Sequence, residues 1–236
     1  MKYTKKSRIL PTFEYEERLW RDDYLVIGVD EVGRGSLAGP VYAGAVCFDS
    51  KEINLPAGKA GKLEIEKFGI NDSKKLKANE RKRLAKIIKK TALTYSIGFS
   101  DVSVVNKLGI VKATKIAIRK AVAEVIKKIS ATYVRSYISC NLYLLLDAFN
   151  VTHVKSIGLK NQLVIIKGDE KSISIAAASI VAKVERDQIM SELHHKYPIY
   201  LWNRNKGYGT RAHIEALKKF GRCKLHRDLF LRKIIF

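Results

Sequence analysis

The chain is short of cysteine, of long apolar runs and of acidic residues, and each shortage excludes a class of protein. Its three cysteines, Cys47, Cys140 and Cys223, lie far apart with no Cys-x-x-Cys spacing. An odd, scattered set argues against a disulfide framework and indicates reduced thiols in a cytoplasmic protein. No apolar run reaches the ~18–20 residues that a membrane helix needs. No long apolar stretch follows the basic start of the chain, so we also expect no signal peptide.

Acidic residues number 23 against 45 lysines and arginines in 236 residues, which leaves a net charge of +22. Such an excess argues for a polyanionic partner and for binding that depends on salt. The alternative is a generally basic proteome, or charge that serves solubility alone. The sequence lacks the residue patterns of two catalytic classes, the serine hydrolases and the zinc enzymes. No Gly-x-Ser-x-Gly turn supports a serine hydrolase, and none of the five histidines pairs with a cysteine at zinc-site spacing. We expect the histidines to be surface or core residues.

The most informative stretch is residues 24–46. A β-branched apolar run from Leu25 to Val29 predicts a buried strand that ends in two adjacent carboxylates, Asp30 and Glu31. Burying two unpaired anions is costly, and a Mg²⁺ or Mn²⁺ ion between them would offset that cost. Neighbours on a strand point to opposite faces, so both can share an ion only if the strand twists or ends there, or if one binds through its backbone or a water. An exposed acidic turn is the alternative.

The turn after these acids favours phosphate chemistry. Gly33 and Gly35 would let the backbone approach a ligand closely, and Arg34 between them is a fork-shaped donor for phosphate or ribose. Anion donors beside a metal site suit the cleavage or transfer of phosphate groups.

Two further apolar runs end in acids. Residues 142–146 precede Asp147, and residues 163–166 precede Lys167-Gly168-Asp169. If these strands neighbour the first, their carboxylates converge and could hold two Mg²⁺ ions ~3.5–4 Å apart, an arrangement that activates water for phosphodiester hydrolysis. Taken singly, each acid could instead be an ordinary turn residue.

The remaining pattern predicts the rest of an α/β domain. We expect an amphipathic helix over 110–129 and a long helix from Ile173 to about His195. A helix from about Ser73 to Lys90 would be capped by Asp72 or Ser73, and its opening would either grip a phosphate or serve only as a cap. The other expectations are a short helix over 13–20, strands over 41–48 and 94–100, of which the first pairs with 25–29 as a hairpin, a loop over 50–70, and a basic helix over 211–220.

These motifs resemble those of the ribonuclease HII family. The resemblance runs from about Val26 to Arg227 and rests on the segments 30–35, 37–41, 144–147, 167–169 and 177–184. It implies a ribonuclease-H-like mixed α/β sheet flanked by helices, with a helical C-terminal extension. Two residues depart from the family pattern: Ala148 replaces a usual Gly, which leaves the local turn in question, and Leu229 stands where Ser is common.

The resemblance also implies residue roles. The metal-binding and catalytic acids would be Asp30, Glu31, Asp147 and Asp169. The substrate contacts would come from the ribose-reading turn, from a segment beside the substrate, from the helix block and from a tyrosine that stacks on the next deoxyribose; these are Gly33, Arg34, Gly35, Ser73, Lys74, Lys183 and Tyr208. Arg186 and Asp187 would either support the metal site or form an exposed ion pair, and we favour the exposed pair.

The implied activity is hydrolysis of RNA in RNA–DNA hybrids and cleavage 5′ of single ribonucleotides embedded in duplex DNA, with Mg²⁺ or Mn²⁺ and with 3′-hydroxyl and 5′-phosphate ends. We expect an N-terminal extension (1–22), a catalytic domain (23–196) and a substrate-binding extension (197–236). The short leader argues against the related type III enzymes. We expect a cytoplasmic monomer without membrane contact; a sliding-clamp contact through residues 229–231 has no support in the sequence. The alternative is a non-catalytic RNA- or hybrid-binding protein, against which the four acids argue.

Overall fold

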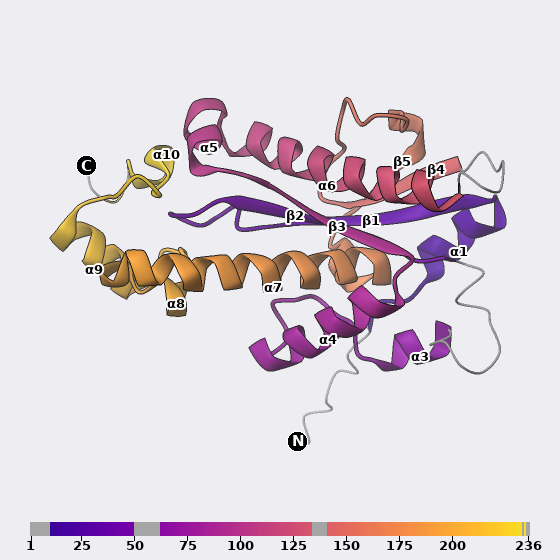
Figure 1. Ribbon diagram of the computed structural model, residues 1–236, viewed down its shortest axis with the longest axis horizontal. Helices are drawn as coiled ribbons and strands as arrows, with labels where there is room; N and C mark the ends of the chain where they lie inside the picture. Colours follow the sequence, from indigo (N-terminus) through magenta and orange to yellow (C-terminus); the bar gives the residue numbers. More distant parts are fainter. Residues whose placement is uncertain (1–9, 50–61, 134–140, 233, 235–236) are drawn as a thin grey trace, which may run out of the picture.

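The computed structural model describes residues 10–49, 62–133, 141–232 and 234, and its centre is a five-stranded mixed sheet of order β3-β2-β1-β4-β5 (Figure 1). Antiparallel pairing joins β1 (Tyr24–Val32) to β2 (Val41–Cys47) and β2 to β3 (Thr94–Ser100). Parallel pairing joins β1 to β4 (Asn141–Asp147) and β4 to β5 (Gln162–Ile165). The mixed α/β sheet predicted from the sequence is therefore confirmed, including the hairpin.

One long helix covers each face of the sheet. The helix α6 (Ile110–Tyr133) packs its alanine and β-branched stripe against Ile27, Val29 and Leu144. The helix α7 (Ile173–Lys196) lies on the opposite face (Figure 1). Within the described part of the chain, no helix is long and apolar enough to cross a membrane.

Small residues let α7 approach the sheet closely. A Cβ atom added at Gly28 would lie 2.2 Å from the backbone of Ser174, and one added at Gly44 would lie 2.3 Å from the carbonyl oxygen of Ala178. Both distances are shorter than any real van der Waals contact, so these strand positions exclude a side chain. Close packing through the small residues Ala176–Ala178 brings the helix against β1 and β2.

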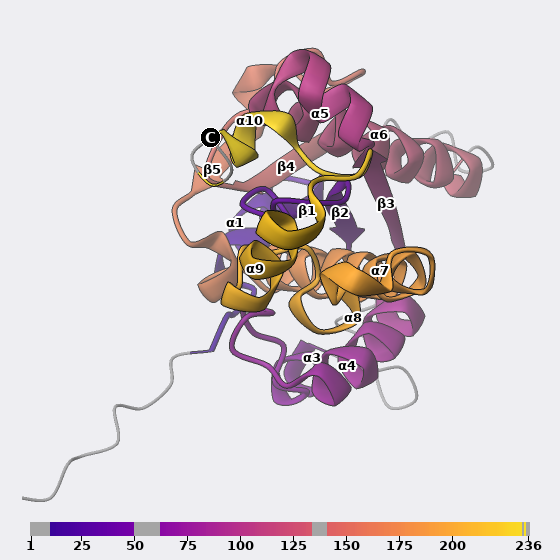
Figure 2. The ribbon, with the colours of Figure 1, turned by 90° about the vertical axis from the view of Figure 1, so that its left-hand side faces the viewer.

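Shorter helices complete both ends of the molecule. On the α7 side lie α1 (Glu14–Arg21), α3 (Lys62–Lys67) and α4 (Ala78–Thr91), while α5 (Val102–Leu108) precedes α6. After the 3₁₀ turn Pro198–Tyr200, the chain forms α8 (Trp202–Asn205), α9 (Arg211–Phe220) and α10 (Asp228–Leu231). Figure 2 shows these three C-terminal helices in front of the end of the sheet, beside the end of α7.

Three sequence expectations need correction. The helix α4 begins at Ala78, with Lys77 as its N-cap, because the Asp72 carboxylate accepts from the Lys74 amide at 2.8 Å and closes a turn there instead. The expected loop over 50–70 contains α3, and its residues 50–61 lie outside the described part. The strand β1 does not end at the Asp30–Glu31 pair but continues to Val32, still paired with β2.

Candidate active site

Asp30 and Asp147 lie on neighbouring parallel strands. In the register of β1 and β4, Val29 pairs with Leu146, and the next residue on each strand is one of these aspartates. Adjacent strands are ~4.8 Å apart. Val26 and Leu145 pack together with Ile175 of α7, so the even positions of β1 and the odd positions of β4 face α7. Both aspartates therefore leave the sheet on the α7 side.

Asp169 joins them from the turn that precedes α7. The backbone amide of Gly168 donates to Asp147 Oδ1 at 2.9 Å, which ties this turn to the end of β4. Lys167 adopts a left-handed conformation with φ 56°, so the chain turns away from the direction of β5 there. Lys74 Nζ lies 3.6 Å from Asp169 Oδ2 and forms an ion pair with it.

The electrostatics show that these carboxylates act on one another. Burial raises the pKa of Asp30 well above its usual value, and the charges of Glu31, Asp147 and Asp169 raise it further. Burial, with the nearby charge of Asp72, raises the pKa of Asp169 to about 6. A divalent cation would favour the charged form of every member of such a group.

Glu31 is placed differently from the three aspartates. It follows Asp30 on a continuous strand, so its side chain leaves on the α6 side. Burial raises the pKa of Glu31 despite the opposing hydrogen bond and charge of Arg34, whose Nη1 donates to Glu31 Oε1 at 3.1 Å. As it stands, no group of three or more His, Cys, Asp or Glu side chains in the described residues is arranged to hold a metal ion.

The residues present nevertheless fit a hard divalent cation. All four candidate ligands carry carboxylate oxygens, which Mg²⁺ and Mn²⁺ prefer. Glu31 Oε2 is buried and has no hydrogen-bond partner among the described residues, and a buried acceptor without a donor is costly. A cation beside it would satisfy that oxygen and offset the repulsion around Asp30.

Two serines connect the acids to the segment before α4. The hydroxyl of Ser179, on α7, hydrogen-bonds to Asp30 and lowers its pKa against the effect of burial. Ser179 Oγ lies 2.9 Å from Ser73 Oγ. Ser73 is thus linked through Ser179 to Asp30, which places the Ser73–Lys74 segment beside the acids. The sequence pointed to Ser73 and Lys74, but not to Ser179 as their link.

The turn at Gly33–Gly35 is shaped by two buried arginines, Arg186 of α7 and Arg227 near the C-terminus. Gly33 has φ 90°, and a Cβ atom there would lie 2.1 Å from Arg186 Nε. Arg186 donates to the Pro40 carbonyl at 3.1 Å and to Ser36 Oγ at 2.8 Å. Arg227 donates to the carbonyls of Gly33 and Arg34 at 2.7 and 2.9 Å. Only glycine fits this left-handed position against a guanidinium.

The expectation of an exposed Arg186–Asp187 ion pair was wrong. Arg186 is fully buried and donates to main-chain carbonyls and a serine. Asp187, one position further round the helix, pairs instead with Lys183 at 2.7 Å and Arg81 at 3.6 Å. Successive helical residues point about 100° apart, so the two cannot share one environment.

Tyr208 lies beside this turn, in the loop between α8 and α9. The cationic groups of Lys183 and Arg186 lie 5.4 and 5.3 Å from the centre of its ring. Arg34, in turn, lies 5.0 Å from the ring centre of Phe149. The structure thus brings Lys183 and Tyr208 together, and it adds Phe149, which the sequence did not single out.

A buried histidine pair supports the loop that carries Tyr208. His213 Nδ1 lies 2.9 Å from the Tyr208 carbonyl, and its Nε2 lies 3.2 Å from Nε2 of His226. The Trp202 indole N–H also donates to His213 Nε2, at 3.1 Å, so that nitrogen is an acceptor and Nδ1 carries the proton. These two histidines are core residues, one of the two alternatives that the sequence left open. Their pairing has no local sequence signal because it depends on tertiary packing.

The arrangement matches known structures of one fold. Bst-RNase HIII in complex with Mn²⁺ aligns with a TM-score of 0.64 at 20% identity, over 86% of this chain and 63% of that chain. Ribonuclease H2 from Pyrococcus horikoshii aligns with a TM-score of 0.58 at 22% identity, over 89% of this chain and 96% of that chain. The class defined by sheet, helices and acids is therefore the ribonuclease-H-like fold.

Within that class, the chain belongs to the ribonuclease HII family. The sequence model described as Ribonuclease HII matches residues 27–233. The Ribonuclease HII of Caldanaerobacter subterraneus is 46% identical over 94% of this chain and 80% of its own length. That of Caldicellulosiruptor bescii is 42% identical over 94% of this chain and 95% of its own length. Ribonuclease H activity follows from this membership, and the resemblance seen in the sequence is confirmed.

Proposed function

We propose that the chain hydrolyses RNA in RNA–DNA hybrids and cuts duplex DNA on the 5′ side of a single embedded ribonucleotide, leaving 3′-hydroxyl and 5′-phosphate ends. The observation that carries this proposal is the convergence of Asp30, Asp147 and Asp169 beside the turn at Gly33–Gly35. Family membership supports the reaction class, and the geometry supports these acids as its site.

Asp30, Asp147 and Asp169 would hold Mg²⁺ or Mn²⁺ directly, and Glu31, whose side chain leaves the other face of β1, would join them by way of a bound water. Bound ions of this kind activate a water and stabilise the departing oxygen of a phosphodiester. The printed description of Bst-RNase HIII as a Mn²⁺ complex supports a divalent ion in this fold. Ser179 orients Asp30 through its hydroxyl. Lys74, whose pKa the charges of Asp169 and Asp72 raise despite its partial burial, stays protonated and can neutralise a substrate phosphate.

The remaining residues would select the ribonucleotide. Gly33, Arg34 and Gly35 would contact the ribose 2′-hydroxyl through backbone groups, because Arg186 and Arg227 fix the shape of that turn. Tyr208 would stack on the following deoxyribose, where a 2′-hydroxyl would crowd it. Ser73 and Lys183 would contact the substrate backbone. These roles rest on the contacts described above and on the family resemblance.

The same proposal includes the organisation of the chain. Residues 23–196 would form the catalytic domain and residues 197–236 a substrate-binding extension, following the N-terminal extension 1–22. We propose a cytoplasmic monomer. RNase HII from Archaeoglobus fulgidus is known in a complex with PCNA, at 24% identity to this chain and with a TM-score of 0.59 over 86% of this chain and 94% of that chain. A clamp contact here would need its own test.

The test is incubation of the protein with duplex DNA that holds one ribonucleotide, with Mn²⁺, with Mg²⁺ and with a chelator. We expect a single cut 5′ of the ribonucleotide that requires either ion. Mapping of the product ends distinguishes 3′-hydroxyl and 5′-phosphate from other chemistry. A protein that binds the duplex equally well in chelator and never cuts it would instead be the non-catalytic hybrid-binding protein.

A further inference from the structure

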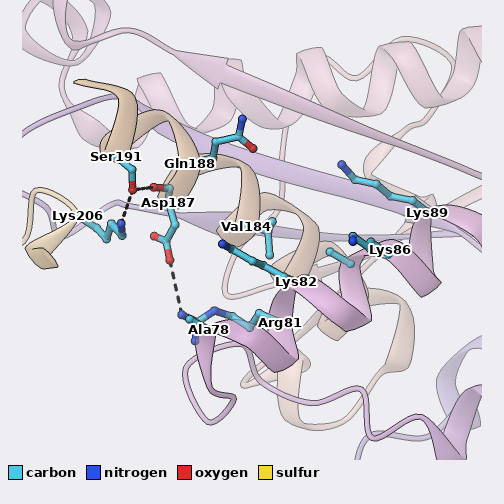
Figure 3. A pocket seen from close by; sticks show the side chains of 11 residues that line it. Ala78, Arg81, Lys82, Lys86, Lys89, Val184, Asp187, Gln188, Ser191 and Lys206 are labelled. Atoms are coloured by element: carbon cyan, nitrogen blue, oxygen red, sulfur yellow. Dashed lines mark hydrogen bonds and ion pairs between the residues drawn. The ribbon is translucent and has the colours of Figure 1, made fainter. Parts of the chain in front are cut away.

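A basic groove runs between α4 and α7 (Figure 3). It lies on the α7 side of the sheet, as do Asp30 and Asp147. Its volume is about 530 Å³. The apolar residues that line it, which we call its floor, are Ala78, Ala85 and Val184. Its polar rim consists of Arg81, Lys82, Lys86, Lys89, Asp187, Gln188, Ser191 and Lys206.

The cations of the groove outnumber its carboxylate. Asp187 is the acid among the lining residues, and it is already engaged by Lys183 at 2.7 Å and by Arg81 at 3.6 Å. Lys82 and Lys86 are exposed on successive turns of α4 and, among the residues that the structure describes, neither forms an ion pair. The groove therefore keeps a positive field that its own residues do not neutralise.

Lys206 lines the groove together with the α4 residues and is affected by their positive charge. Its Nζ donates to Ser191 Oγ at 2.6 Å and to the Asn203 carbonyl at 2.7 Å, so the ammonium group is held in place at the groove. Burial lowers the pKa of Lys206, and the charges of Lys183, Lys82 and Arg81 lower it further, although Asp187 opposes them. An anion in the groove would remove that penalty.

The groove lies a short distance along α7 from the candidate active site. Ser179, which contacts Asp30, precedes Asp187 by eight residues, or about 12 Å of helix. That distance corresponds to about three to four base pairs of duplex. Arg81 connects the two places directly, because its Nη1 donates to the Ser73 carbonyl at 2.9 Å while its Nη2 pairs with Asp187. One duplex could thus contact both.

We infer that this groove binds backbone phosphates of the substrate duplex about three to four base pairs from the cut. The inference rests on the proposed function for the position of the cut, but the binding itself does not depend on catalysis. Phosphate oxygens would pair with Lys82, Lys86 and Lys206, and the apolar floor would accommodate the sugars. The groove reads no base edge, so it adds affinity without sequence preference.

The test compares Lys82→Gln/Lys86→Gln with a matched control, Lys112→Gln/Lys127→Gln. The control removes the same charge from α6, on the opposite face of the sheet (Figure 1). Binding of a fluorescent duplex with one ribonucleotide is measured in chelator over a range of salt concentrations. Cleavage by each variant is then measured in Mn²⁺. Far-ultraviolet circular dichroism checks that both variants are folded.

We expect the slope of log affinity against log salt to become shallower by about 2 for the groove variant relative to the control. Its KM should rise while kcat at saturation is unchanged. Shortening the duplex to about three base pairs on one side of the ribonucleotide should make the unmodified protein behave like the groove variant. Equal slopes and equal KM for the two variants would overturn the inference. Absence of cutting by the unmodified protein would overturn the proposed function instead, whatever the slopes show.

Discussion

Arg227 Nη1 donates to the carbonyl oxygen of Gly33 at 2.7 Å, a bond that joins residues 194 positions apart. The same side chain donates through Nε to the Gly39 carbonyl at 2.9 Å, and it is fully buried. Burial and the neighbouring charge of Arg186 lower the pKa of Arg227 to about 9. A buried cation that serves three main-chain carbonyls means that the C-terminal segment determines the shape of the turn beside the acids.

Replacement of Arg227 therefore tests both stability and discrimination. Arg227→Met leaves the carbonyls of Gly33, Arg34 and Gly39 without this donor, and we expect a loss of about 2–4 kcal/mol in the free energy of unfolding. The preference for a ribonucleotide over a deoxyribonucleotide should fall as well. Arg227→Lys retains charge but not the planar fork, so it should recover only part of both. Denaturant titration and cleavage of matched duplexes measure the two effects; full recovery by Lys would contradict the role of the fork.

Asp30→Asn should abolish cleavage without harming the metal-free protein. Removing one charge relieves the repulsion that Asp30 shares with Glu31, Asp147 and Asp169. The free energy of unfolding in chelator should be equal or slightly higher. Addition of Mn²⁺ should raise the melting temperature of the unmodified protein more than that of the variant. Thermal melts with and without the ion provide the measurement, and a loss of more than about 2 kcal/mol in chelator would show that Asp30 is mainly structural.

The buried histidine pair predicts an acid-sensitive C-terminal segment. Burial and the neighbouring His213 lower the pKa of His226 from 6.5 to about 4. At pH values between these limits the unfolded chain binds more protons than the folded one, so stability is present above about pH 6.5 and is lost as the pH falls toward 4. His226→Gln should flatten this dependence. Urea midpoints across the range measure it, with the exposed His195→Gln as control; identical pH profiles for the two variants would refute the assignment.

Tyr208 should act through the face of its ring. The cationic groups of Lys183 and Arg186 lie near the centre of that ring, so the ring already takes part in contacts with neighbouring groups. Tyr208→Phe keeps the face and should change kcat/KM only a few-fold, whereas Tyr208→Ala should lower it about tenfold or more, since it removes the apolar ring that would pack on the deoxyribose. Steady-state cleavage of a duplex with one ribonucleotide measures both, and equal losses would argue for the hydroxyl group instead.

Ala148 carries backbone strain directly after Asp147. Its φ is 70°, in the left-handed region where an L side chain is strained. Gly is usual at this position in the resembling family, and Ala148→Gly should raise the free energy of unfolding by about 1 kcal/mol. Denaturant unfolding measures the change. A loss of stability on this substitution would mean that the methyl group packs well enough to outweigh the strain.

The amino-acid sequence determined the local elements and their chemistry. Short apolar runs specified the strands, and an alanine-rich apolar periodicity specified the helix that begins at Ile173, because both patterns are local. Acids directly after such runs, beside Gly33–Gly35, indicated metal-dependent phosphate chemistry before any contact was known. The sequence predicted the start of α4 several residues too early. An aspartate that closes a turn and an aspartate that caps a helix look the same in a sequence, and Asp72 closes a turn.

Only the tertiary structure decided which acids meet and what holds them. The pairing of β1 with β4 places Asp30 beside Asp147, and strand pairing over more than a hundred residues leaves no local trace. Because β1 continues to Val32, the Glu31 side chain points to the face of the sheet opposite that of Asp30. A strand that ended at these acids would have allowed both side chains to point to the same side. Arg186 and Arg227 are charged residues that a sequence places at the surface. They are buried here because the main-chain carbonyls of distant turns supply the acceptors that make their burial tolerable.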